Sequence, residues 1–222
     1  MHFVRKIHPG PPCLEEEKLK NAGTYRCEGV IQRLKAEFHD KCYICEQRAL
    51  TAINVEHFRP HMQNIDRKFD WSNLFYSCSH CNNLKNANYQ YILDCTDPNA
   101  DINNKIKHRI GYMPKEVVKL EATSDDFETL ETLDLLNAVY NGAHTETKDI
   151  EASNLRDKIL EEINVFNKLL HDWIKEPENG ELKNYLDMQI RSRLGNHSEF
   201  ASFKRSMILD SDYFRPLFQN AF

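Results

Sequence analysis

The sequence predicts an α+β fold in which helices predominate. Apolar residues recur at helical spacing through most of the second half of the chain, and the first half contains short β-branched runs. The composition, with 41% hydrophobic and 28% charged residues among 222, is typical of a globular protein and excludes a fibrous or largely disordered chain. We expect a sizeable core, in one domain with an extension or in two small domains.

Nothing in the sequence indicates export or membrane insertion. No apolar run approaches the length of a membrane-spanning helix, and the N-terminal residues lack the apolar segment of a secretory signal. Seven cysteines, an odd number, do not predict a disulfide framework in such a chain. We therefore expect a cytoplasmic protein without a membrane partner.

The first 98 residues predict an N-terminal arm and a small module of mixed structure. Residues 1–23 contain a Gly-Pro-Pro turn and an acidic run, which favour an arm. Within residues 24–98, helical spacing of apolar residues, β-branched alternation and a polar loop predict helix, strand, strand and helix in that order. These four elements are expected at residues 25–39, 50–58, 71–77 and 81–90.

The remaining residues, 99–222, predict a mostly helical region. A loop and a small hairpin are expected at residues 99–120, and four amphipathic stripes follow. Breaks are expected at Glu176-Pro177 and Asn179-Gly180, because proline and glycine interrupt helices. The helices are expected around residues 127–140, 155–173, 185–194 and 200–209.

The formal net charge of −5 is unevenly distributed. Residues 1–119 contain 18 Lys and Arg against 14 Asp and Glu, a net charge of +4, whereas the rest contain 11 against 20, a net charge of −9. The total argues against a protein that coats nucleic acid non-specifically. The asymmetry favours two separate roles for the two halves, although two ordinary solvated surfaces would also account for it.

Four of the seven cysteines form two Cys-x-x-Cys pairs, Cys42 with Cys45 and Cys78 with Cys81. Each pair places two thiolates on one side of a tight turn, and two such turns complete the tetrahedral sulfur shell that suits a structural Zn²⁺. The alternatives are two unrelated pairs of buried thiols or a redox motif. Cys13, Cys27 and Cys95 stand apart from the pairs and are expected to remain reduced.

Between and just after the cysteine pairs lie residues whose chemistry suits phosphodiester hydrolysis: Glu56, His57, Asn73, Asn82 and Lys85. A neutral imidazole accepts a proton from water near pH 7. Carboxylate and carboxamide oxygens bind a divalent ion and leave positions open for water and phosphate. Lysine binds phosphate as a point charge. Each residue also has an ordinary alternative, such as a helix N-cap for Asn82.

These motifs carry a resemblance to a known family. Residues 42–85 contain, in order, the first Cys-x-x-Cys, an acidic residue followed by His, Asn-Leu, and Cys-x-x-Cys-Asn-x-x-Lys. This series of motifs resembles that of the HNH endonucleases with a ββα-metal fold. The resemblance implies that Cys42, Cys45, Cys78 and Cys81 bind a structural zinc. It further implies a DNA substrate and a catalytic divalent ion, Mg²⁺ or Mn²⁺.

The resemblance also implies a role for each site residue. His57 would be the general base, Glu56 and Asn82 would hold the catalytic ion, and Asn73 would tie the loop and help to position His57. Lys85, Arg59 and His61 would contact nucleic acid. The chain departs from the family pattern at Glu56, where aspartate is more common. In addition, Glu56 and His57 are neighbours, and neighbouring side chains on a regular strand point to opposite faces. Glu56 and His57 share a site only if the strand ends or twists there.

Looser patterns extend the resemblance along the chain. Four segments contribute: R-K-I-H-x-G-P-P-x-L, E-H-F-R-P, T-L-x-L-L-N and N-L-R-x-K-I-L. Together they make the chain similar to the HNH effector subunit of Septu-type anti-phage systems, which is found also in some retron-associated modules. This similarity implies an ABC-type ATPase as partner. The chain has no P-loop of its own, so any ATP dependence would come from another protein. Residues 99–222 and the N-terminal arm would then dock the partner. A stand-alone restriction-type nuclease and a degenerate zinc-clipped binding module are the alternatives.

Overall fold

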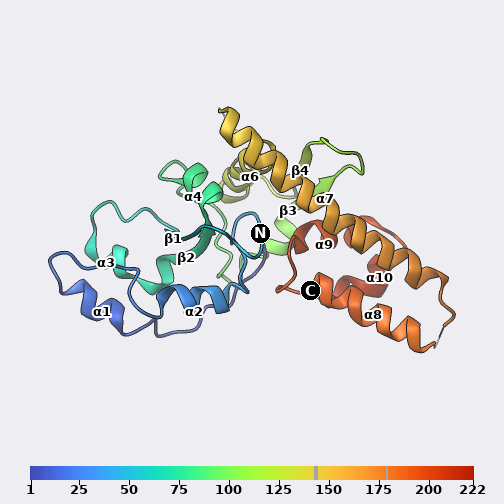
Figure 1. Ribbon diagram of the computed structural model, residues 1–222, viewed down its shortest axis with the longest axis horizontal. Helices are drawn as coiled ribbons and strands as arrows, with labels where there is room; N and C mark the ends of the chain where they lie inside the picture. Colours follow the sequence, from blue (N-terminus) through green and yellow to red (C-terminus); the bar gives the residue numbers. More distant parts are fainter. Residues whose placement is uncertain (143–144, 179) are drawn as a thin grey trace.

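The computed structural model describes residues 1–142, 145–178 and 180–222, and its architecture is α+β with far more helix than strand, as predicted. The described residues form two antiparallel two-stranded sheets, β1 (Ile53–His57) with β2 (Leu74–Cys78) and β3 (Ile106–Ile110) with β4 (Val118–Ala122). In Figure 1 the elements up to α4 gather at one end, and the long helix α7 extends from the middle toward the other end. Each described helix is too short or too polar to cross a membrane.

The helices of the first part are short. The helix predicted at 25–39 begins only after Gly29, whose φ of 86° is a left-handed conformation that glycine adopts readily, and it ends where His39 and Asp40 turn the chain with φ of 57°. A short helix near the N-terminus was not predicted. The helices are α1 (Cys13–Lys18), α2 (Val30–Glu37), α3 (Ile65–Phe69) and α4 (Ser79–Lys85).

Strands β1 and β2 form the hairpin that was predicted between the cysteine pairs. Ile53 lies opposite Cys78, and His57 lies opposite Leu74. The connecting loop holds α3 and a short 3-10 turn at Trp71–Asn73, so the second strand begins later than predicted. Helix α4 starts inside the second cysteine pair, because the sulfur of Cys78 caps it by accepting from the backbone N–H of Cys81.

The predicted hairpin of the second part is β3 and β4, preceded by the short helix α5 (Ile102–Lys105). Helix α7 is longer than its apolar stripe indicated, because Thr145 caps it by accepting from the N–H of Lys148 before a polar first turn. The break before α8 lies at 176–180, of which Asn179 is outside the described residues. The remaining helices are α6 (Phe127–Asn141), α7 (Glu146–Lys175), α8 (Glu181–Leu194), α9 (Ala201–Asp210) and α10 (Arg215–Phe218).

One hydrophobic cluster joins both parts of the chain. It contains Phe75 and the four paired cysteines from the first part together with Leu135, Tyr140 and Phe203 from the second. The first residues belong to it as well: Met1 and Val4 are buried, and the N–H of Val4 donates to the carbonyl of Cys95 at 2.7 Å. The beginning of the predicted arm is therefore packed into the core.

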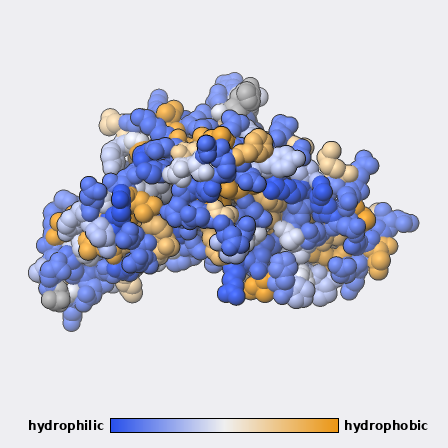
Figure 2. All heavy atoms as spheres, turned by 180° about the vertical axis from the view of Figure 1, so that it is seen from behind, coloured by the Kyte–Doolittle hydropathy of each residue, from blue (hydrophilic) through white to orange (hydrophobic). Residues whose placement is uncertain are grey.

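A second, smaller cluster holds the far end of the molecule together. Trp173 of α7, Ile190 of α8, Ile208 of α9 and Phe218 of α10 are among its buried members. Figure 2 shows the face opposite to that of Figure 1, where hydrophilic residues predominate and apolar residues form small, separate groups. The second cluster buries the apolar stripes of the amphipathic helices, and this burial is the reason that the second part folds as helices.

The prediction that Cys13 and Cys27 remain reduced is wrong in this structure. Their sulfur atoms are joined in a disulfide, with the two Cα atoms 6.1 Å apart. An odd number of cysteines argues against a framework of several disulfides but not against a single disulfide. Cys13 and Cys27 come together only because the chain between α1 and α2 folds back. Cys95 is free and buried, as expected.

Candidate metal centre and active site

The two cysteine pairs meet in one buried cluster. One sulfur from each of Cys42, Cys45, Cys78 and Cys81 lies within 4.8 Å of all the others, and none of the four is in a disulfide. Tetrahedral coordination at a Zn–S distance of about 2.3 Å requires sulfur atoms about 3.8 Å apart, and the sulfurs of Cys45 and Cys78 are 3.9 Å apart. The cluster could therefore hold a structural metal ion such as zinc.

Contacts from the helical part fix the cysteine turns. The hydroxyl of Tyr140 on α6 donates to the carbonyl of Cys45 at 3.3 Å. His80, inside the second pair, places Nδ1 2.7 Å from Glu151 Oε2 and Nε2 2.9 Å from the carbonyl of Val139. His80 thus joins the turn to α6 and α7 and does not compete for the metal.

Glu56, His57 and Asn82 line a common open cavity of about 470 Å³ beside this cluster. Glu56 and His57 are the last two residues of β1, and after one further backbone hydrogen bond, from the N–H of Phe58 to the carbonyl of Asn73 at 2.9 Å, the chain turns into the loop. Neighbours on a continuing strand would face opposite ways, but the cavity lies at the strand end, where both side chains reach it. Asn82 reaches the cavity from the first half of α4.

His57 is held by contacts on several sides. Its Nε2 lies 3.0 Å from the carbonyl oxygen of Lys68, which can only accept, so the neutral ring carries its proton on Nε2 and leaves Nδ1 as the basic nitrogen. The rings of Tyr25 and His61 lie 4.5 and 4.7 Å from it, both edge to face. Burial lowers the pKa of His57, which keeps the ring neutral at physiological pH.

Glu56 is paired with a buried lysine. Its Oε1 lies 3.0 Å from Nζ of Lys85, which also donates to the carbonyl of His57 at 3.2 Å. Burial raises the pKa of Glu56, while the attraction of Lys85 acts in the opposite direction. Lys85 is fully buried and so differs from the exposed phosphate-binding lysine that was expected, because α4 packs its side chain against the end of β1.

The two asparagines occupy different surroundings. Asn73 is buried and makes three hydrogen bonds: its Oδ1 accepts from the N–H of Arg59 at 2.7 Å, and its Nδ2 donates to the carbonyls of Arg59 and Arg67 at 2.9 and 3.1 Å. It therefore ties both sides of the loop between β1 and β2. Asn82 is half-buried and is not the N-cap of α4, because Cys78 occupies that position.

Arg59 and His61 lie near the cavity in the loop after β1. The guanidinium of Arg59 stacks on Phe58 at 4.7 Å and on Tyr91 at 5.6 Å, so its contacts are with aromatic rings of the protein. His61 lines the cavity next to His57 and accepts from the N–H of Gln63 at 3.2 Å.

No family model and no curated protein matches the chain. Sequence reasoning missed Tyr25, which lines the cavity and contacts His57 although it precedes the first cysteine pair by many residues. Its position inside the loop closed by the Cys13–Cys27 disulfide gives no signal in the sequence.

Proposed function

We propose that this chain is a metal-dependent endonuclease of the HNH type, with a ββα-metal module at β1, β2 and α4, that hydrolyses DNA phosphodiester bonds. The proposal rests on one observation, that Glu56, His57 and Asn82 line the same cavity beside a four-cysteine cluster. The order of motifs along residues 42–85 and the hairpin that carries them support it.

In this proposal His57 is the general base. The proton on Nε2 is held by the carbonyl of Lys68, so Nδ1 is free to accept a proton from water as the water oxygen bonds to phosphorus. The oxygens of Glu56 and Asn82 would hold Mg²⁺ or Mn²⁺, which supplies charge stabilisation at the phosphate and the departing sugar oxygen. Asn73 fixes the loop that carries Arg59, and thereby the end of β1.

We further propose that the nuclease acts in the cytoplasm as the effector of a Septu-like anti-phage complex with an ABC-type ATPase. The acidic charge of the second half, a net −9 over residues 120–222, supports a docking role for that half, because it is unsuited to contact with DNA. The modest +4 of the first half supports delivery to DNA by a partner, since binding by charge strengthens with each phosphate neutralised.

A plasmid-nicking assay tests the activity. Wild type and His57→Ala would be purified, alone and together with the proposed ATPase partner, and incubated with supercoiled plasmid and Mg²⁺ or Mn²⁺. Loss of a general base typically costs about 10²–10⁴-fold in rate. His39→Asn, which removes an exposed histidine outside the cavity and outside the proposed docking region, is the control and should leave nicking unchanged. Equal nicking by wild type and His57→Ala would rule out catalysis by His57.

One observation favours a second candidate function. The Lys85 ammonium neutralises Glu56, which would reduce the affinity of this carboxylate for a divalent ion. The chain would then be a zinc-clipped module that binds nucleic acid or a protein partner without cleaving. DNA binding that persists in EDTA-washed protein, with no nicking in any divalent metal, would support this alternative.

A further inference from the structure

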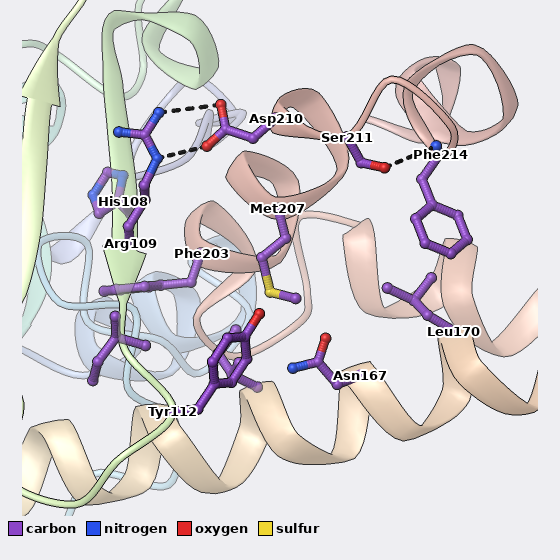
Figure 3. A pocket seen from close by; sticks show the side chains of 12 residues that line it. His108, Arg109, Tyr112, Asn167, Leu170, Phe203, Met207, Asp210, Ser211 and Phe214 are labelled. Carbon is purple, nitrogen blue, oxygen red and sulfur yellow. Dashed lines mark hydrogen bonds and ion pairs between the residues drawn. The ribbon is translucent and has the colours of Figure 1, made fainter.

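A second cavity lies far from the candidate site, between β3, α7 and α9. Its volume is about 360 Å³. In Figure 3 the Tyr112 phenol, the Asn167 amide and the Met207 thioether point toward one another across it. These residues come from the β3–β4 loop, α7 and α9, so three separate elements converge on one space. None of these side chains takes part in the site described above.

The cavity occupies the seam between the two hydrophobic clusters. Ile163 and Phe203 in its wall belong to the large cluster, Leu170 and Phe214 pack in the small one, and Met207 contacts both. Most of the wall is therefore apolar. A molecule bound here would replace missing packing between the two clusters, and burial of apolar surface would favour its binding.

A small number of polar groups also line the cavity. His108 lies on its β3 side, and the ring Nδ1 donates to the carbonyl of Ile106 at 2.9 Å, so Nε2 is an acceptor. This Nε2 is buried and has no hydrogen-bond partner among residues 1–142, 145–178 and 180–222. This nitrogen has almost no accessible surface, so it is closed off from the cavity and offers no contact to a bound molecule. The amide of Asn167 faces the cavity and offers N–H donors and a carbonyl acceptor.

The cavity has no charge to offer a ligand. Arg109 is engaged by Asp210 on two nitrogens, at 2.6 and 3.2 Å, and by Glu121 at 2.6 Å on the third. Phosphates and carboxylates would therefore find no free cation among the described lining residues, and an ammonium would find no free carboxylate.

We propose that this cavity is a binding site for a small, uncharged, planar ring compound that carries an N–H donor. A volume near the lower end of the usual range of about 300–1,000 Å³ suits one or two fused rings. Tyr112 and Met207 supply an aromatic ring and a polarisable thioether that face the cavity, and both pack well against a flat π-system. This site is separate from the proposed nuclease function and does not depend on it.

Two sources share this chemistry, a nucleoside and an indole-type ring. Both contain a planar, uncharged ring system with an N–H donor, but only the nucleoside carries a ribose and, in adenosine, a neighbouring donor and acceptor that can pair with the Asn167 amide. Adenosine and indole are therefore the two probes, used separately at millimolar concentrations on the full chain.

Methyl-labelled methionine provides a direct readout by NMR. The chain has 5 methionines, and Met207 alone lines this cavity, whereas Met62 and Met188 are exposed elsewhere. We expect saturable shifts of the Met207 methyl with at least one probe and none at Met62 or Met188; Met207→Leu assigns the signal. Absence of saturation with both probes, or equal shifts at all three methyls, would overturn the proposal.

Paired variants on α7 test the polar contact. Asn167→Ala should weaken binding of the responding probe about three- to tenfold, the loss expected for one hydrogen bond. Asn164→Ala removes an exposed asparagine one turn earlier on the same helix and should leave binding unchanged. His108→Phe alters a ring whose free nitrogen is closed off from the cavity, and it should leave binding unchanged. Equal affinities of Asn167→Ala and wild type would contradict the assignment of the Asn167 amide.

Discussion

The ammonium of Lys85 lies 3.0 Å from Glu56 Oε1 in a pair that is almost excluded from solvent, with 0% and 9% of the two side chains exposed. The pair joins α4 to the end of β1 next to His57, whose carbonyl accepts from the same ammonium. Burial lowers the pKa of Lys85 and raises that of Glu56, while their mutual attraction opposes both shifts. The position of a proposed metal ligand thus depends on a residue that was expected to contact DNA.

Removal of Lys85 should destabilise the fold strongly. Lys85→Met leaves the Glu56 carboxylate buried without its partner, which typically costs about 3–5 kcal/mol. Denaturant unfolding of the zinc-loaded protein measures the change. The double variant Glu56→Gln with Lys85→Met should be less destabilised than the sum of the two single variants, because no unpaired charge remains.

Lys35→Met is the control for this experiment. Lys35 lies 3.5 Å from Asp40, but its side chain is half-exposed, and such surface pairs contribute about 0–1 kcal/mol. Equal losses of stability for Lys35→Met and Lys85→Met would contradict the importance of the buried pair.

Metal analysis should find about one tightly held zinc per chain after dialysis against a weak chelator. Cys81→Ser should lower this content and the unfolding temperature together, because binding free energy at a structural site is also folding free energy. Cys95→Ala alters another buried thiol outside the cluster and should retain the metal. Metal-free wild-type protein, or equal metal loss in both variants, would refute the four-cysteine site.

Acidification should destabilise the protein through His108. Burial lowers its pKa from 6.5 to about 3, with the nearby amino terminus lowering it further and Glu46 raising it. Between these two values the unfolded chain binds a proton that the folded chain does not, so stability is lost as pH falls from 6.5 toward 3. At pH 5 the loss amounts to about 2 kcal/mol.

His2, whose pKa is also lowered to about 3 by burial, acts in the same direction, so a comparison of variants is needed. His108→Phe should flatten the fall of unfolding free energy between pH 7 and pH 5 relative to wild type. Parallel pH profiles of the two proteins would contradict a buried neutral His108.

Asn73→Ala should loosen the loop between β1 and β2. It removes three hydrogen bonds, each worth about 0.5–1.5 kcal/mol. Asn54→Ala, on β1, removes one side-chain hydrogen bond, from Nδ2 to Ser79 Oγ at 2.9 Å, and should cost correspondingly less. Hydrogen exchange at the Arg59 amide should accelerate in Asn73→Ala only; unchanged protection there would show that Asn73 does not hold the loop.

Features that depend on local spacing could be predicted from the sequence. Each of the two cysteine turns and the apolar stripes of α6 to α9 are patterns of residues close together in the chain. The meeting of the two turns could be predicted because a zinc shell needs four ligands and each turn supplies two. The approach of Glu56 and His57 to one cavity required only that β1 end where it does.

Features that depend on distant packing were beyond the sequence. Lys85 looked exposed because nothing nearby shows that α4 packs on β1, and Cys13 and Cys27 are paired only by the fold of the loop between α1 and α2. The contact of Tyr25 with His57 has the same cause.

The cysteine turns are buried against the helical part through Tyr140 with Cys45 and His80 with Glu151, and Ser202 on α9 donates its backbone N–H to buried Glu46 at 3.0 Å. A fragment that stops at residue 98 would expose to water these polar groups and the apolar residues that the second part covers in the shared core. This fragment should aggregate or bind metal poorly. A chain whose C-terminal region is exchanged or shortened should behave in the same way. Any division of labour between the two parts therefore exists within a single folding unit.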